Sequence, residues 1–124
     1  MGPHQLTIAE ASHLIHQKKL TPTKLTESLL KRIEQLEPHL HAWVTIDKED
    51  ALKTAEARTR EAEEAELRSP LHGISIGLKD IYFTAGLKTT CGSKLMSNYE
   101  PEHNATTVTK LKRAGAIILG KTET

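Results

Sequence analysis

One short segment, residues 74–79, constrains the fold more than any other part of the sequence. Its aliphatic residues alternate with small or polar ones: Ile74, Ile76 and Leu78 with Ser75, Gly77 and Lys79. A period of two is typical of a β-strand with one apolar face. A second, fully apolar run, Ala116 to Leu119, predicts another buried strand. A chain with two such strands needs helices to cover them.

The same alternation places Lys79 on the face opposite the three aliphatic residues. Ser75 and Gly77 share its face and are small, which leaves room for a long side chain and for another backbone to approach. A lysine housed in this way is desolvated, and desolvation favours the neutral amine, which accepts a proton near neutral pH. Lys79 is therefore a candidate catalytic base. Lysines at strand ends also commonly reach water, and the pattern alone leaves both interpretations open.

The remaining segments predict helices and one further strand. Thr7 and Glu10 have the spacing of a capping box at the start of a short helix. Thr21-Pro22 should start a second helix that ends before Pro38, because the residue preceding a proline avoids the α region. Residues 42–46 then form a candidate strand.

Two more helices are expected in the second half of the chain. Asp47 should cap an alanine-rich helix reaching about Leu67, and Asn104 should cap a helix that ends at Gly115. The element order is then helix, helix, strand, helix, strand, loop, helix, strand. That order indicates an α/β fold with a largely buried sheet.

Composition excludes several classes of partner. The chain of 124 residues has 17 basic and 16 acidic residues, a net charge of +1, so no overall field favours nucleic acid or an anionic membrane. Its apolar runs are too short to span a bilayer, and no secretory leader is evident. A single cysteine fits a reducing compartment. We therefore expect a soluble cytoplasmic protein.

Other candidate sites have simpler interpretations. His13 and His16 lack a third metal ligand at a suitable spacing, and Trp43 is more typical of a core than of a cofactor site. The glutamates at 61, 63, 64 and 66 indicate a solvated helix face. Cys91 has no histidine placed by local spacing to activate it as a nucleophile. We expect neither a metal nor a cofactor.

Residues 115–122, GAIILGKT, match the G-x-x-x-x-G-K-[ST] pattern of a phosphate-binding P-loop. That loop requires a strand before its first glycine and a helix after its last residue. Here a predicted helix precedes Gly115, and the four intervening residues are strand-forming aliphatics. The context therefore argues against a nucleotide site.

Two longer runs, GISIGLKDIYFTAGLKTTCGSK and HNATTVTKLKRAGAIILGKTET, resemble the amidase signature family. That family has a G-I-P-x-x-x-K-D strand, a T-x-G-S turn, and a later helix and strand with A-G-A-x-x-x-G-K-T. The resemblance extends from Thr7 to Thr124 and is strong after Pro70. Ser75 stands where the family usually has proline, which the chemistry does not require.

The resemblance implies a hydrolase of carboxylic amides that uses a Ser-cis-Ser-Lys triad, with Lys79 as the lysine. The two serines would lie in a Gly/Ser-rich segment beyond the present sequence. The chain then represents the start of a larger α/β domain with a mixed sheet flanked by helices: residues 1–69 form a mainly helical region, and residues 70–124 form the core strands and the helix of the lysine motif. Without the segments that would cover it, the Lys79 amine should be accessible.

Two functional hypotheses follow. The first is the N-terminal part of an amidase, inactive alone and acting on a small amide once completed by downstream sequence. The alternative is a non-catalytic interaction or structural module derived from the same fold. Under either hypothesis, incompletely covered apolar strands predict self-association or a complementary chain, without nucleic-acid or membrane binding.

Overall fold

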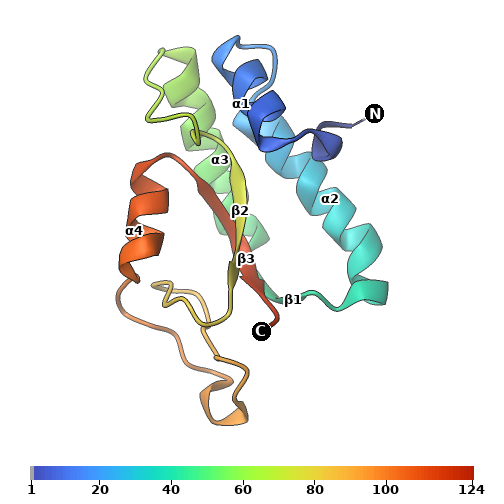
Figure 1. Ribbon diagram of the computed structural model, residues 1–124, viewed down its shortest axis with the longest axis vertical. Coiled ribbons are helices and arrows are strands. Elements are labelled where there is room, and N and C mark those ends of the chain that lie inside the picture. The colour runs from blue at the N-terminus through green and yellow to red at the C-terminus, as the bar shows by residue number, and fades with distance from the viewer. Residues whose placement is uncertain (1) are drawn as a thin grey trace.

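The computed structural model describes residues 2–124 and has an α/β architecture, as the sequence predicts (Figure 1). The helices are η1 (Pro3–Gln5), α1 (Ile8–His16), α2 (Pro22–Leu40), α3 (Lys48–Glu63), η2 (Lys94–Met96) and α4 (Thr106–Arg113). The strands are β1 (Trp43–Ile46), β2 (Ser75–Lys79) and β3 (Ile117–Thr122).

The three strands form one mixed sheet in the order β1-β3-β2. The central strand, β3, pairs antiparallel with β1 and parallel with β2. The long connection from β2 to β3 contains α4, as a parallel crossover requires. Strand β3 therefore has a partner on each side, and the sheet edges in the described residues are β1 and β2.

Helices lie on both sides of the sheet, with α4 opposite α2 (Figure 1). Two groups of buried apolar residues join the first three helices to the strands. One consists of Ala11, Ile15, Leu20, Leu25 and Ile74. The other consists of Leu30, Ala51, Ala55, Ile117 and Leu119. The small alanines of α3 let that helix approach β3 closely.

Side-chain caps fix the starts of the first three α-helices as predicted. Thr7 and Glu10 form the reciprocal capping box of α1, and Thr21 accepts a hydrogen bond from the Lys24 N–H at the start of α2. Asp47 accepts one from the Asp50 N–H at the start of α3.

The predicted end of the second helix was wrong, because α2 continues through Pro38 to Leu40. Pro38 removes one hydrogen bond, the one to the Glu34 carbonyl oxygen, and because both residues are exposed that oxygen is free to turn toward water. The helix ends instead at His41, which adopts the left-handed conformation with φ of 50°. The Glu37 carboxylate then accepts hydrogen bonds from the Ala42 and Trp43 N–H groups, at 2.6 and 2.9 Å.

Two further boundaries differ from the sequence prediction. The N-cap of α4 is Ala105, without a side-chain hydrogen bond, because the Asn104 side chain accepts instead from the Ala85 N–H at 2.8 Å. Helix α3 ends at Glu63 rather than near Leu67. The segment that follows turns back toward α4, where the Arg68 guanidinium donates to the Lys112 carbonyl oxygen at 3.3 Å.

A bulge in β3 alters which face its last residues occupy. Ile76 pairs with Ile118 but Gly77 pairs with Gly120, so Leu119 is an extra residue on β3. Gly120 is required at this point, because a Cβ atom there would collide with the carbonyl oxygen of Thr45 on β1. After the bulge, Lys121 lies opposite Leu78, and Thr122 lies opposite Lys79.

Candidate active site

Lys79 is the last residue of β2, and its side chain is exposed. The two small residues on its face have packing partners. The Ser75 hydroxyl contacts the Thr26 hydroxyl of α2 at 3.1 Å, and a Cβ on Gly77 would lie 2.6 Å from a ring carbon of Trp43. The space beside Ser75 and Gly77 is therefore filled by α2 and Trp43, and not by a buried lysine side chain. The Lys79 amine is accessible, in agreement with the expectation for this length of chain.

The residue after Lys79, Asp80, is 1% exposed. Both its backbone and its carboxylate make hydrogen bonds. Its backbone N–H donates to the Thr122 carbonyl oxygen at 3.0 Å, and its own carbonyl oxygen accepts from the Cys91 N–H at 2.8 Å. Its carboxylate accepts from the Thr90 N–H at 3.1 Å and from the Thr90 hydroxyl. The chain immediately after Lys79 is thus tied to the end of β3 and to the turn at 90–91.

The buried lysine in this structure is Lys121, whose side chain is 0% exposed. Its ammonium donates to the Tyr82 carbonyl oxygen at 2.6 Å and to the Thr89 hydroxyl at 2.9 Å, and it lies 3.7 Å from an Asp80 carboxylate oxygen. Burial lowers the pKa of Lys121 from its ordinary value of 10.5, and the Asp80 carboxylate opposes part of that effect. A buried cation with three oxygen partners is well satisfied.

This polar cluster joins three sequence motifs that lie far apart in the chain. Asp80 belongs to the K-D strand motif, Thr90 to the T-x-G-S turn and Lys121 to the G-K-T strand end. The hydrogen bonds of Asp80 and Lys121 bring all three together at the end of β2. Lys79, in the first of these motifs, is exposed.

Cys91 lies at the surface and Trp43 lies beside the core. Cys91 is exposed, has a left-handed backbone with φ of 53° and makes no side-chain hydrogen bond in the described part of the chain. Trp43 is half-buried against the second core cluster.

In the described residues, His13 and His16 are not joined by a third side chain that could hold a metal ion. His16 Nδ1 lies 2.8 Å from the Ser12 carbonyl oxygen on its own helix. In residues 2–124, no group of three or more His, Cys, Asp or Glu side chains is arranged to hold a metal ion.

The acidic run at the end of α3 is only partly a solvated face. Three of its glutamates are exposed, but Glu61 is half-buried and accepts hydrogen bonds from Arg58 at 2.6 Å and Arg68 at 2.7 Å. Partial burial alone raises the pKa of Glu61, and the hydrogen bonds from Arg68 and Arg58 outweigh it, so the pKa is lowered. Glu61 therefore joins α3 to the segment that follows it.

The P-loop interpretation is excluded by the backbone. Gly115 follows helix α4 with φ of 91°, and residues 117–122 form one strand, so no loop is available between the two glycines of the pattern. The glycine at 120 allows the backbone of β1 to approach β3 closely.

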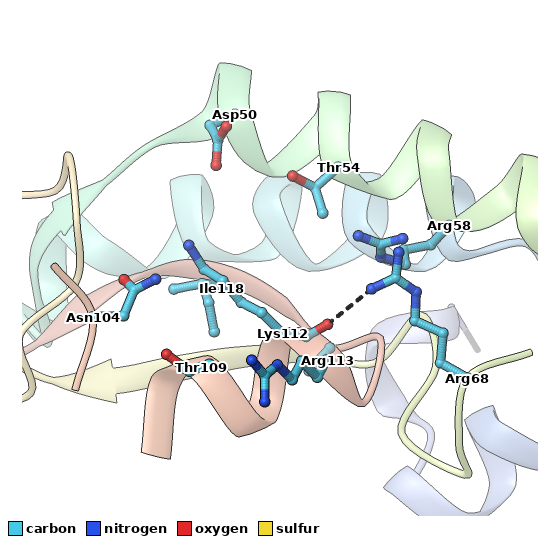
Figure 2. Close-up of a pocket in the computed structure, with 10 residues that line it drawn as sticks. Asp50, Thr54, Arg58, Arg68, Asn104, Thr109, Lys112, Arg113 and Ile118 are labelled. Carbon is cyan, nitrogen blue, oxygen red and sulfur yellow. Dashed lines mark hydrogen bonds between the residues drawn. The ribbon is translucent and has the colours of Figure 1, made fainter. Parts of the chain in front are cut away.

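A cavity of about 390 Å³ lies between α3 and α4 (Figure 2). Four basic side chains line it, with Asp50 and three uncharged polar residues: Arg58, Arg68, Lys112, Arg113, Thr54, Asn104 and Thr109. Neither Lys79 nor Asp80 is among its lining residues. This cavity and the candidate active site are therefore separate features.

Comparison with known proteins assigns the fold to a family. The model of the Amidase family matches residues 24–124. The chain belongs to the amidase signature family. A glutamyl-tRNA(Gln) amidotransferase subunit of Desulfatibacillum aliphaticivorans is 40% identical over 122 residues, which are 98% of this chain and 25% of that protein. The same subunit of Dehalococcoides mccartyi strain CBDB1 is 43% identical over 118 residues, 95% of this chain and 24% of that protein.

Solved amidase structures agree with this assignment. The peptide amidase of Stenotrophomonas maltophilia superposes with a TM-score of 0.90 at 38% identity, over 97% of this chain and 25% of that one. A structure described as an amidase superposes with a TM-score of 0.86 at 33% identity, covering 95% of this chain and 27% of its own. The chain thus spans about a quarter of the length of these amidase relatives.

Sequence reasoning identified Lys79 and Cys91 but did not identify Asp80, Thr90 or Lys121 as a connected site. One signal for this site was present in the sequence. Lys121 follows the aliphatic residues of a buried strand, so its ammonium must either reach water or find buried acceptors. The only acidic residue in the motif segment 70–93 is Asp80. The sequence therefore allowed the prediction that the Lys121 ammonium pairs with the Asp80 carboxylate.

Proposed function

We propose that these 124 residues are the N-terminal part of an enzyme that hydrolyses carboxylic amides, with Lys79 as its catalytic base. The observation that carries the proposal is the position of Lys79: it ends a strand of the amidase fold, within the K-D motif, and its amine is free to meet a further segment. Residues 1–124 would then be an incomplete amidase domain in a cytoplasmic protein.

In the proposed reaction, the neutral Lys79 amine accepts a proton from a bridging serine. That serine in turn takes the proton of a nucleophilic serine as the latter attacks the amide carbonyl carbon. That proton returns from Lys79 through the bridging serine to the leaving nitrogen, the C–N bond breaks, and the neutral amine leaves. Water then hydrolyses the acyl-enzyme to the carboxylic acid and frees the serine. Both serines would come from sequence outside these 124 residues, and no cofactor takes part.

The substrate class we propose is a linear carboxylic amide. The relatives include a peptide amidase and amidotransferases, and both names describe chemistry at an amide or its nitrogen. A base alone does not complete covalent catalysis, because a nucleophile and an oxyanion site are also needed. We therefore expect the 124-residue chain by itself to hydrolyse no amide.

A chimera provides the test. Residues 1–124 replace the matching quarter of Stenotrophomonas peptide amidase, and ammonia release from a peptide amide is measured. We expect activity that Lys79→Met abolishes and that Lys88→Met, a change at an exposed lysine nearby, preserves. A folded chimera that is equally active with Lys79→Met would disprove the catalytic role. Turnover of carboxamides by the 124 residues alone would contradict the need for downstream serines.

A further inference from the structure

We propose that Asp80 and Lys121 are positioning residues that fix the direction in which Lys79 leaves the sheet. This inference rests on the proposed role of Lys79, because it explains how that side chain is aimed. Neither residue is proposed to touch substrate.

The pair cannot act by direct contact with the same substrate atoms as Lys79. In the register of the sheet, Lys121 is opposite Leu78 and Thr122 is opposite Lys79. Directly opposed residues share a face, and successive residues alternate faces, so Lys79 and Lys121 project from opposite faces of the sheet. The two side chains therefore make no direct contact across the sheet, and Lys121 acts on the position of Lys79 through the backbone between them.

The backbone after Lys79 offers such a route. Asp80 follows Lys79 directly, and its N–H and C=O are both used, toward Thr122 and Cys91 respectively. The Lys79 carbonyl oxygen accepts from the Ile81 N–H at 2.7 Å and the Tyr82 N–H at 3.1 Å, which closes a tight turn. Residues 79–82 are therefore locked between β3 and the turn at 90–91.

The buried side chains hold that turn in place. The Lys121 ammonium binds the Tyr82 carbonyl oxygen and the Thr89 hydroxyl, while the Asp80 carboxylate binds both donors of Thr90. One cation and one carboxylate, 3.7 Å apart, thus connect both ends of the 80–90 loop. An apolar side chain at 121 would leave the Tyr82 oxygen and the Asp80 charge without this partner.

Both the positive charge and the geometry of the Lys121 ammonium are needed to hold this turn. A lysine ammonium directs three donors to separate acceptors, whereas the planar fork of arginine suits a single carboxylate and is larger than the fully buried space at 121. We therefore expect Lys121→Arg to restore only part of what Lys121→Met removes.

Hydrogen exchange of the 124-residue chain tests the structural step. We expect Lys121→Met and Asp80→Asn to speed exchange of the Thr90 and Cys91 amides by about tenfold or more. Both amides donate to Asp80, and each variant removes one charge of the ion pair that holds Asp80 in place. Exchange of core amides in β3, such as Ile117, should change less. Lys88→Met is the matched control, since Lys88 is an exposed lysine of the same loop. Unchanged exchange at 90 and 91 in both variants would overturn the proposal.

Activity of the chimera tests the positioning step. We expect Lys121→Met to lower kcat by about 100-fold with little change in KM, because a displacement of about 1 Å at a catalytic group has that effect. The kcat is expressed per mole of folded chimera, so that loss of folded enzyme alone leaves it unchanged, and Lys121→Arg should recover part of the lost kcat.

The outcomes separate the two proposals. If Lys79→Met leaves hydrolysis intact, the proposed function fails. If Lys79→Met abolishes hydrolysis but Lys121→Met behaves like Lys88→Met, only the positioning role fails. If the Lys121→Met chimera does not fold, exchange at Thr90 and Cys91 in the shorter chain decides the case.

Discussion

At the scale of single residues, the two lysines at the end of the sheet have opposite environments. Lys79 is exposed, whereas Lys121, on the opposite face, is fully buried beside Asp80. The difference originates in the bulge at Gly120, which shifts Lys121 out of the alternation that Ile117 and Leu119 establish. The burial of Lys121 has a consequence that can be measured by titration.

We predict that Lys121 makes stability rise with pH in the alkaline range. Its pKa in the folded chain is lowered below 10.5 by burial. Between that lowered pKa and 10.5 the unfolded chain binds more protons than the folded one, so the free energy of unfolding increases with pH. Urea unfolding of the wild type and of Lys121→Met, from neutral pH up to the ordinary lysine pKa, isolates this contribution, because the other lysines titrate in both. A difference that stays flat or falls over this range would contradict it.

Sequence-based predictions for single residues were confirmed where the interacting residues lie close together in the chain. The capping box of Thr7 and Glu10 depends on a spacing of three residues, and it is present. Lys121 could not be placed in this way, because its face depends on a bulge in β3 opposite β2, a pairing between strands distant in sequence. Asn104 has the preference of an N-cap residue, but a tertiary contact with Ala85 uses its side chain.

At the scale of elements, the junction between α2 and β1 shows why a helix passes a proline. Glu37 lies next to Pro38, and its carboxylate holds the two N–H groups that lead into β1. The sequence rule that a helix stops before proline describes a backbone preference. Here the carboxylate and the left-handed His41 define the end of the helix.

We predict that Glu37→Ala destabilises the chain by about 1–2 kcal/mol, because two hydrogen bonds to a charged group are lost at a partly exposed position. Glu34→Ala is a suitable control on the same helix. Its ion pair with Lys48 has side chains 58% and 61% exposed, so the change should cost under about 0.5 kcal/mol. Chemical denaturation measures both. Equal losses in the two variants would show that Glu37 does not secure the junction.

At the scale of the whole molecule, the described residues form a sheet with layers of helices, yet the segment 81–99 presents apolar side chains to solvent. Its exposed members are Ile81, Tyr82, Leu95 and Tyr99, and Leu95 is 98% exposed. No helix within residues 2–124 is both long and apolar enough to cross a bilayer. The chain spans only 25% of the relatives' length, and we propose that the additional part of the fold covers this segment.

The α/β class and the mixed sheet followed from the order of the elements and from the family resemblance. The strand order β1-β3-β2 did not, because it depends on pairing between residues far apart in the chain. For the candidate site, sequence pattern located the lysine motif. It could not reveal that the neighbouring motifs meet in one buried cluster, since burial of Lys121 requires the 80–93 loop to fold over it.

We predict that the isolated chain self-associates, or binds a complementary chain, through the 81–99 segment and the β2 edge. Apolar surface gathered on one loop and an unpaired strand edge both favour association. Sedimentation at increasing concentration should show species larger than the monomer, and Leu95→Lys should reduce them. Leu40→Lys, at an exposed leucine at the end of α2, is the control and should have less effect. A monodisperse, cooperatively folding monomer at high concentration would show that these residues close their own core, and the interpretation as part of a larger domain would lose its main physical support.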